Sequence, residues 1–231
     1  KTRKEINSKK IGLIGHSEGG IIAPIVAAKN KDIAYIVLLA GSGIPGDELL
    51  LEQTELIGKA AELSENELTE NHKSNTKVYS ILKTEKNPEE AKKQLIPIMQ
   101  AGFDKLPADQ KPSTEEINAI LAEQLNAITS PWFIHFISYN PALILKEVKC
   151  PVLVLNGEKD IQVPSKSNTQ AIKTALEKGG NKKVTVVEFP NMNHLFQECK
   201  ICNVEEYETL EQTFSPIVLK QISDWITLQI K

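Results

Sequence analysis

The sequence predicts an α/β fold in which a doubly wound parallel sheet carries a helical insertion. Short apolar segments alternate with segments of helical periodicity, which is the order of elements found in parallel sheets. A pentapeptide of the form G-x-S-x-G joins the first apolar segment to a helix, and residues 45–146 show helical patterns without a strand. The 231 residues, 41% of them apolar, are sufficient for one large domain with a sizeable core.

The first predicted strand leads directly into the G-x-S-x-G turn. Ile11–Ile14 is the expected strand, and a helix of small and branched residues follows over Gly20–Asn30. Between them, Gly15-His16-Ser17-Glu18-Gly19 has the pattern of a nucleophile elbow, whose flanking glycines let the strand and helix backbones pass closely. The elbow predicts that Ser17 projects its hydroxyl above the sheet, while His16 points away from Ser17 and serves in packing.

A second strand is predicted over Ile33–Ala40, because this nearly continuous apolar run is typical of a parallel strand covered on both faces. Residues 45–146 are then helical in pattern and rich in acidic side chains. Two capping boxes mark helix starts in this stretch: Ser64 with Glu67, and Ser113 with Glu116. We interpret residues 45–146 as a cap or lid inserted between two strands, and a separate helical bundle without a link to the site is the alternative.

The strand pattern resumes after the insertion. Cys150–Leu155 and Val184–Phe189 are the next expected strands. A helix is predicted from about Ser165 to Lys178, and a last helix begins at Ser215-Pro216, where a capping residue precedes a proline at the first helical position. We therefore assign residues 1–44 and 147–231 to the α/β core.

The elbow predicts an acid and then a histidine downstream, each in a loop after a strand. Asp160 lies in a polar turn directly after the third expected strand, and His194 lies in the loop after the fourth. Catalytic groups in open parallel sheets gather at the carboxyl ends of strands. A serine hydroxyl is a poor nucleophile near neutral pH and needs an adjacent base. The sequence thus predicts a catalytic triad of Ser17, His194 and Asp160.

Three segments carry a resemblance to a known superfamily. They are Gly-His-Ser-Glu-Gly-Gly at residues 15–20, Cys-Pro-Val-Leu-Val-Leu-Asn-Gly-Glu-Lys-Asp-Ile-Gln-Val-Pro at 150–164, and Pro-Asn-Met-Asn-His-Leu-Phe-Gln at 190–197. On these segments the chain resembles the α/β-hydrolase superfamily, and within it bacterial carboxylesterases of the serine-hydrolase type, which are often grouped with serine aminopeptidase-like hydrolases. The resemblance covers residues 9–44 and 139–231, and the insertion matches only in being helical.

The resemblance implies a role for each residue of the triad. Ser17 would attack the substrate, His194 would take and return its proton, and Asp160 would orient His194 and stabilise the imidazolium. The backbone N–H of Glu18 would supply one donor of the oxyanion hole. The implied reaction is the hydrolysis of carboxylic esters of small to medium acyl groups through an acyl-enzyme. An aminopeptidase or a thioesterase with the same triad is the alternative.

The sequence departs from the superfamily before the elbow. The superfamily has several strands there, and the loop after the third of them supplies the second oxyanion donor. Residues 1–10 are polar and charged, and we expect the end of a helix and a turn in them. We therefore interpret the sequence as the C-terminal part of a longer hydrolase, whose first strand has an open apolar edge. A truncated, non-catalytic interaction module is the competing interpretation.

Composition limits the partners and cofactors that we expect. The net charge of −3 gives no general attraction to nucleic acid or to acidic membranes, and no apolar run is long enough to span a membrane. We expect no cofactor and no metal, and a small-molecule ester as the substrate. The aromatic residues Trp132, Phe133 and Phe136 are expected to line the acyl side of the pocket. The compartment and the oligomeric state are not indicated.

The cysteines allow two interpretations. Cys199 and Cys202 form a C-x-x-C pair, and Cys150 stands apart. A zinc site would require further ligands at suitable spacing, and His194 is the only nearby histidine. We favour plain loop cysteines, with a local disulfide as the second possibility.

Overall fold

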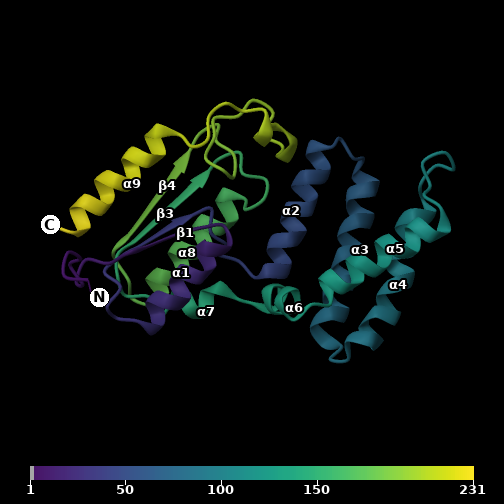
Figure 1. The fold of residues 1–231 in the computed structure, drawn as a ribbon, viewed down its shortest axis with the longest axis horizontal. Helices are drawn as coiled ribbons and strands as arrows, with labels where there is room; N and C mark the ends of the chain where they lie inside the picture. The colour runs from purple at the N-terminus through teal and green to yellow at the C-terminus, as the bar shows by residue number, and fades with distance from the viewer. Residues whose placement is uncertain (1–2) are drawn as a thin grey trace. The chain divides into compact units, whose positions relative to one another are not determined.

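The computed structural model describes residues 3–231, which form two compact units (Figure 1). The first unit contains the residues up to Pro45 together with Asn140–Lys231, and the second contains Gly46–Tyr139. All the described β-strands belong to the first unit.

A four-stranded parallel sheet is the centre of the first unit. Its strands are β1 (Leu13–His16), β2 (Ile36–Leu39), β3 (Val152–Gly157) and β4 (Val184–Phe189), in the order β1-β2-β3-β4. All three pairings are parallel, so the carboxyl ends of the four strands point to one edge of the sheet. The α/β fold with a parallel sheet is therefore confirmed.

Helices cover both faces of this sheet, as Figure 1 shows. Helices α1 (Glu18–Lys29), α7 (Pro141–Leu145) and α8 (Ser165–Lys178) contribute to a core on one face, and α9 (Pro216–Gln229) contributes to a core on the other. Strand β2 shows the alternation directly, because Ile36 and Leu38 belong to the first core whereas Val37 and Leu39 belong to the second. Burial on both faces is the reason that this strand has a continuous apolar sequence.

Strand β1 lies at the end of the sheet. It pairs with β2 from Leu13↔Ile36 to His16↔Leu39, and among the described residues no strand pairs with its other edge. Ile14, in the middle of this strand, is 56% exposed. An exposed apolar edge of this kind is a ready template for a further strand.

The second unit is entirely helical within the described chain. It contains α2 (Gly46–Ala60), α3 (Glu65–Thr84), α4 (Pro88–Asp104), α5 (Thr114–Ile128) and α6 (Pro131–Ser138). Both predicted capping boxes are present at the starts of α3 and α5. The core of this unit is formed by leucine and isoleucine side chains of four helices: Leu82, Leu95, Ile117, Leu121, Leu125 and Ile137.

Some element boundaries differ from the expected ones. Residues 3–10 form turns and no helix, and the rest of the expected helix end lies outside the described residues. Strand β1 begins at Leu13 and not at Ile11, because the parallel ladder with β2 begins there. Helix α7 belongs to the first unit, since its residues Ala142 and Leu145 pack in the core with α1 and α8. In the described part of the chain, no helix combines the length and the apolar character that crossing a bilayer requires.

Candidate active site

The G-x-S-x-G segment forms a sharp turn between β1 and α1. Ser17 stands between the last residue of the strand and the first residue of the helix, and its backbone has φ 54° and ψ −114°. A positive φ is unfavourable for a residue with a Cβ atom and persists only where the surrounding structure holds it. The Ser17 N–H donates to Leu39 O at 2.8 Å, which ties the turn to the neighbouring strand.

The glycines of this turn do not contribute equally. A Cβ atom on Gly15 would lie 1.9 Å from Gly19 O, and one on Gly20 would lie 2.6 Å from the Cα atom of Gly41. A Cβ atom on Gly19 would have no neighbour within 4 Å. The expected close approach of strand and helix is present at Gly15, but the second glycine that it requires is Gly20 and not Gly19.

Asp160 lies in the turn after β3, and all of its hydrogen bonds hold its carboxylate in place. Its Oδ1 accepts from the backbone N–H groups of Gln162 at 2.9 Å and Val163 at 2.8 Å. Its Oδ2 accepts from His194 Nδ1 at 2.8 Å and from Asn156 Nδ2 at 3.3 Å. The side chain is fully buried, so these partners replace water around the charge.

His194 lies in the loop after β4, and the structure brings it into contact with Asp160. A carboxylate accepts hydrogen bonds, so Nδ1 of His194 carries the proton in this pair. The other ring nitrogen, Nε2, is then the one that can accept a proton from a hydroxyl. The His194 side chain is 6% exposed. An oriented, buried imidazole of this kind is suited to act as a general base.

The loop that carries His194 is held by side chains that the sequence analysis missed. Asn193 Oδ1 accepts from the N–H groups of Leu195 and Gln197, both at 3.0 Å, and Asn193 Nδ2 donates to Gln197 Oε1 at 2.9 Å. Phe196 is fully buried with a φ of 58°. Strain next to a functional residue is kept only where packing and hydrogen bonds determine the conformation. The Asn193–Gln197 pair and the burial of Phe196 supply both.

Tyr207 connects the loop of Asp160 with the region after His194. Its hydroxyl accepts from Gln162 Nε2 at 2.9 Å. Burial raises the pKa of Tyr207, and the hydrogen bonds from Gln162 and from the His194 backbone oppose this shift. The phenol is therefore neutral near pH 7 and acts as a fixed polar support beside the pair of Asp160 and His194.

His16 makes a contact that was not expected from the sequence. Its Nε2 lies 2.9 Å from the carbonyl oxygen of His194, and the two ring centroids are 4.7 Å apart. Desolvation is the largest cause that lowers the pKa of His16, and the charge of His194 lowers it further. The hydrogen bond to His194 O and the charge of Asp160 act in the opposite direction. The residue predicted for packing alone therefore connects the elbow to the histidine loop. No sequence signal marked this contact, because it depends on the path of a loop far along the chain.

Ser17 is adjacent to this contact, since it follows His16 directly. Within residues 3–231 the Ser17 hydroxyl forms no hydrogen bond to His194. Catalytic hydrogen bonds are often long without substrate and shorten in the reacting complex. Glu18 is the first residue of α1, and the first amides of a helix point beyond its N-terminal end, where they favour negative charge.

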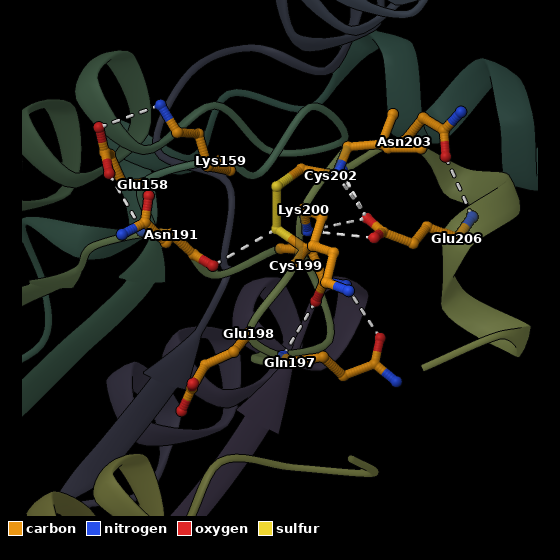
Figure 2. Close-up of a disulfide and its surroundings, with 12 residues drawn as sticks. Glu158, Lys159, Asn191, Gln197, Glu198, Cys199, Lys200, Cys202, Asn203 and Glu206 are labelled. Atoms are coloured by element: carbon orange, nitrogen blue, oxygen red, sulfur yellow. Dashed lines mark hydrogen bonds and ion pairs between the residues drawn. A yellow bond between two sulfur atoms is a disulfide. The ribbon is translucent and has the colours of Figure 1, made fainter. Parts of the chain in front are cut away.

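Cys199 and Cys202 form a disulfide, which corrects the preference for plain loop cysteines (Figure 2). Around it, the Glu206 carboxylate accepts from the backbone N–H groups of Cys202, Ile201 and Lys200. The bond from Cys202 is the largest cause that lowers the pKa of Glu206. Cys199 Sγ also contacts Asn191 O at 3.4 Å. The disulfide thus closes a small loop just beyond the residues that hold His194.

This loop also contains three side chains that could hold a metal if the two cysteines were reduced. Among the described residues, Cys199, Cys202 and Glu206 are brought close enough for their ligand atoms to share an ion. Zinc binds to thiolates, and the two sulfurs are joined to each other here. The arrangement is therefore that of a structural disulfide with a carboxylate bound to three consecutive N–H groups.

The three aromatic residues proposed for the pocket lie on α6 in the second unit. Trp132 is 56% exposed and stacks on Phe136, with ring centroids 5.6 Å apart and planes at 11°. Phe133 and Phe136 pack against the core of their own unit. Their role as the wall of an acyl pocket stays a prediction.

The chain was compared with protein families, with proteins of curated function and with solved structures. A family model described as BAAT / acyl-CoA thioester hydrolase C terminal matches residues 1–142 and 138–199. A search among proteins of curated function finds no match.

Solved structures of hydrolases are similar to the chain at low sequence identity. An α/β fold family hydrolase from Bacillus anthracis str. Sterne is 15% identical with a TM-score of 0.45, over 96% of this chain and 67% of that one. The Pyrococcus horikoshii acylaminoacyl peptidase is 12% identical with a TM-score of 0.40, over 81% and 20%. A Pyrococcus furiosus esterase is 17% identical with a TM-score of 0.38, over 79% and 45%. The chain thus spans less than half the length of the last two.

Proposed function

The chain belongs to the BAAT / acyl-CoA thioester hydrolase C-terminal family of α/β-hydrolases, and we propose that it cleaves carboxylic esters with Ser17 as the nucleophile. His194 is the general base and Asp160 orients it. The observation that carries this proposal is the buried contact of 2.8 Å between His194 Nδ1 and Asp160 Oδ2. It lies at the same edge of the sheet as the strained turn of Ser17, to which His16 connects it.

The proposed reaction has two steps. In the first, Ser17 Oγ attacks the acyl carbon while its proton passes to His194 Nε2. The tetrahedral intermediate then expels the alcohol, which takes the proton from His194, and the acyl group remains on Ser17. In the second step, a water molecule repeats the attack with His194 as its base and releases the acid. Asp160 stabilises the imidazolium in both steps because its carboxylate is fixed on Nδ1.

The oxyanion of each step requires donors that are already in place. The N–H of Glu18, at the start of α1, is the donor that the elbow supplies. One such donor contributes about 3 kcal/mol of transition-state stabilisation. A second donor comes from a loop before the elbow in α/β-hydrolases. The described residues before β1 form turns without a strand, and we assign no second donor among them.

The second unit is proposed to act as a cap over the acyl group. It is inserted in the sequence between β2 and β3, and its first connection follows the carboxyl end of β2, at the edge of the sheet where Ser17, Asp160 and His194 also follow their strands. The exposed Trp132 and its partner Phe136 offer a flat apolar surface for an acyl chain.

Hydrolysis of a nitrophenyl ester by the complete protein tests the assignment of Ser17. The Ser17→Ala variant is expected to lose at least about 10³-fold in kcat, since the acyl-enzyme cannot form. Ser138→Ala, at an exposed position at the end of α6, is the matched control and is expected to keep full activity. Equal activity of the Ser17→Ala variant and the control would contradict the proposal.

A thioester is the second candidate substrate, and the family match is the observation that favours it. The same acyl-enzyme forms whether an alcohol or a thiolate leaves. Release of free thiol from an acyl thioester, compared with release of nitrophenol from the ester of the same acyl group, separates the two. A kcat/KM at least tenfold higher for the thioester would assign the chain to thioester hydrolysis, and the reverse ratio would assign it to oxygen esters.

A further inference from the structure

We propose that His16 is a positioning residue that fixes the backbone of His194 relative to the nucleophile. This inference rests on the proposed role of His194 as the base. It assigns a function to the variable position before the serine in G-x-S-x-G.

The hydrogen bond between His16 and His194 has a defined direction. His16 Nε2 lies 2.9 Å from His194 O, and a carbonyl oxygen only accepts, so Nε2 of His16 carries the proton. The His16 ring also packs on the His194 ring at 4.7 Å and on the Phe196 ring at 6.3 Å. One side chain therefore contacts both the backbone and the ring of the base.

The sheet itself does not join the elbow to the histidine loop. The strand order is β1-β2-β3-β4, so Ser17 follows one outer strand and His194 follows the other. Asp160 fixes the His194 ring from β3, but it has no contact with the elbow among its hydrogen bonds. The bond from His16 spans the sheet and connects the residue before the nucleophile directly to the base.

The charge state of His16 agrees with this role. Desolvation is the main cause that lowers its pKa, with the charge of His194 acting in the same direction, so the ring is neutral near pH 7. During the reaction His194 becomes an imidazolium, and a neutral neighbour at 4.7 Å avoids the repulsion that a second cation would bring. A neutral imidazole can still donate from Nε2, so positioning and charge neutrality are compatible.

Three substitutions separate the donor from the ring. In His16→Gln the Nε2 amide can donate from nearly the same place as the imidazole Nε2, without an aromatic ring. In His16→Asn the same amide is one bond shorter and does not reach His194 O. In His16→Phe the ring remains and the donor is lost. If His16 serves only in packing, His16→Phe should be the best tolerated of the three variants. If His16 acts as a positioning donor, His16→Gln should be the best tolerated.

Steady-state kinetics on a nitrophenyl ester, with thermal unfolding as a check of folding, test the proposal in the complete protein. We expect kcat to fall at least tenfold in His16→Phe and His16→Asn with KM within twofold of the wild type, and His16→Gln to keep at least a third of the wild-type kcat. A misplacement of about 1 Å in a catalytic group is sufficient for a loss of this size. If His16→Phe matches or exceeds His16→Gln, or if all three keep wild-type kcat or lose it equally, the inference is wrong.

The rate of labelling with a fluorophosphonate distinguishes this failure from failure of the proposed function. An unlabelled wild type would contradict the role of Ser17 itself. A labelled wild type with equal labelling rates in His16→Gln, His16→Asn and His16→Phe would leave Ser17 as the nucleophile and overturn the role of His16 alone. If His16→Phe does not fold, the comparison of His16→Gln with His16→Asn still decides the question.

Discussion

Asp160 and His194 form the best supported pair of the site at the scale of single residues. Asp160 receives hydrogen bonds on both oxygens, from two backbone N–H groups and from His194 and Asn156. These partners fix the carboxylate before any substrate arrives, which is what a residue that selects one tautomer of an imidazole requires. Substituting Asp160 therefore changes the chemistry of His194 more than the fold.

The substitution Asp160→Asn is expected to lower kcat/KM for a nitrophenyl ester by about 10⁴-fold. An amide nitrogen at Oδ2 would donate to His194 Nδ1 and place the imidazole proton on Nε2, where it blocks the base. Asp224→Asn is the matched control, because Asp224 is exposed on α9 and pairs with Lys220 at the surface. A loss of less than tenfold in Asp160→Asn would contradict the role of Asp160.

Glu206 allows a prediction on pH. The hydrogen bond from the Cys202 N–H is the main cause that lowers its pKa below the usual 4.5. A carboxyl with a lowered pKa contributes stability above its ordinary pKa, and this contribution disappears as the pH falls through the folded-state pKa. We expect Glu206→Gln to lower Tm at neutral pH and the difference from the wild type to shrink at about pH 3.

Thermal unfolding of both proteins at the two pH values checks this expectation. Glu205→Gln is the matched control, since the carboxyl group of Glu205 is adjacent in the sequence and exposed. A Tm difference for Glu206→Gln that stays constant or grows toward acid pH would show that the carboxylate does not stabilise the loop by its charge.

At the scale of elements, the elbow depends on the close packing of β1, α1 and the turn after β2. Gly20 lies so close to Gly41 that a Cβ atom on Gly20 would be 2.6 Å from the Cα atom of Gly41. The Cα atom belongs to the backbone and cannot rotate away as a side chain could. Gly19 occupies the same helix and has open space around the position of a Cβ atom. Position 20 therefore requires a residue without a Cβ atom, whereas position 19 has room for one.

We predict that Gly20→Ala lowers both Tm and esterase activity, because α1 must move away from Gly41 and take the elbow with it. Gly19→Ala is expected to leave activity within twofold and to raise stability by roughly 0.5–1 kcal/mol, since alanine favours a helix over glycine. Chemical denaturation and ester kinetics of the pair measure both effects. Equal stabilisation of the two variants would show that helix propensity, and not the contact with Gly41, decides the outcome.

The Cys199–Cys202 disulfide gives a second prediction for an element, the loop after His194. A cross-link over this short loop is expected to contribute about 2 kcal/mol by restricting the unfolded chain. Reduction should then lower Tm by roughly 4–8 °C. Cys199→Ser should reproduce the change without reductant, and Cys150→Ser, which leaves the disulfide intact, should not.

Counting free thiols in the unfolded protein verifies the oxidation state. One thiol is expected before reduction and three after it, since the chain has three cysteines and Cys150 is free. A reduced protein with the Tm of the oxidised form would show that the hydrogen bonds of Glu206 hold the loop without the disulfide.

At the scale of the whole molecule, the sequence was sufficient to predict the parallel sheet and the superfamily, and both are confirmed. Strand patterns that are continuous, as in β2, arise from burial on both faces and are visible in the sequence. The rule that functional groups follow the carboxyl ends of strands located Asp160 and His194, which the structure then brought together.

Other features depend on long-range geometry and were not predictable. The contact of His16 requires the loop of β4 to turn back across the sheet, and the place of α7 in the first unit follows from packing against α1 and α8. The sequence analysis favoured plain loop cysteines over the Cys199–Cys202 disulfide, because C-x-x-C spacing does not by itself show that the two sulfurs meet. The residues described before β1 form turns, and we assigned no second oxyanion donor among them.

The central claim is that Ser17 is the nucleophile of a serine hydrolase. The most direct test is to treat the complete protein with a fluorophosphonate and to locate the adduct by mass spectrometry of its peptides. The account predicts one adduct, on Ser17, that Asp160→Asn forms more slowly and Ser17→Ala does not form. An adduct on another residue, or none on the folded protein, would contradict it.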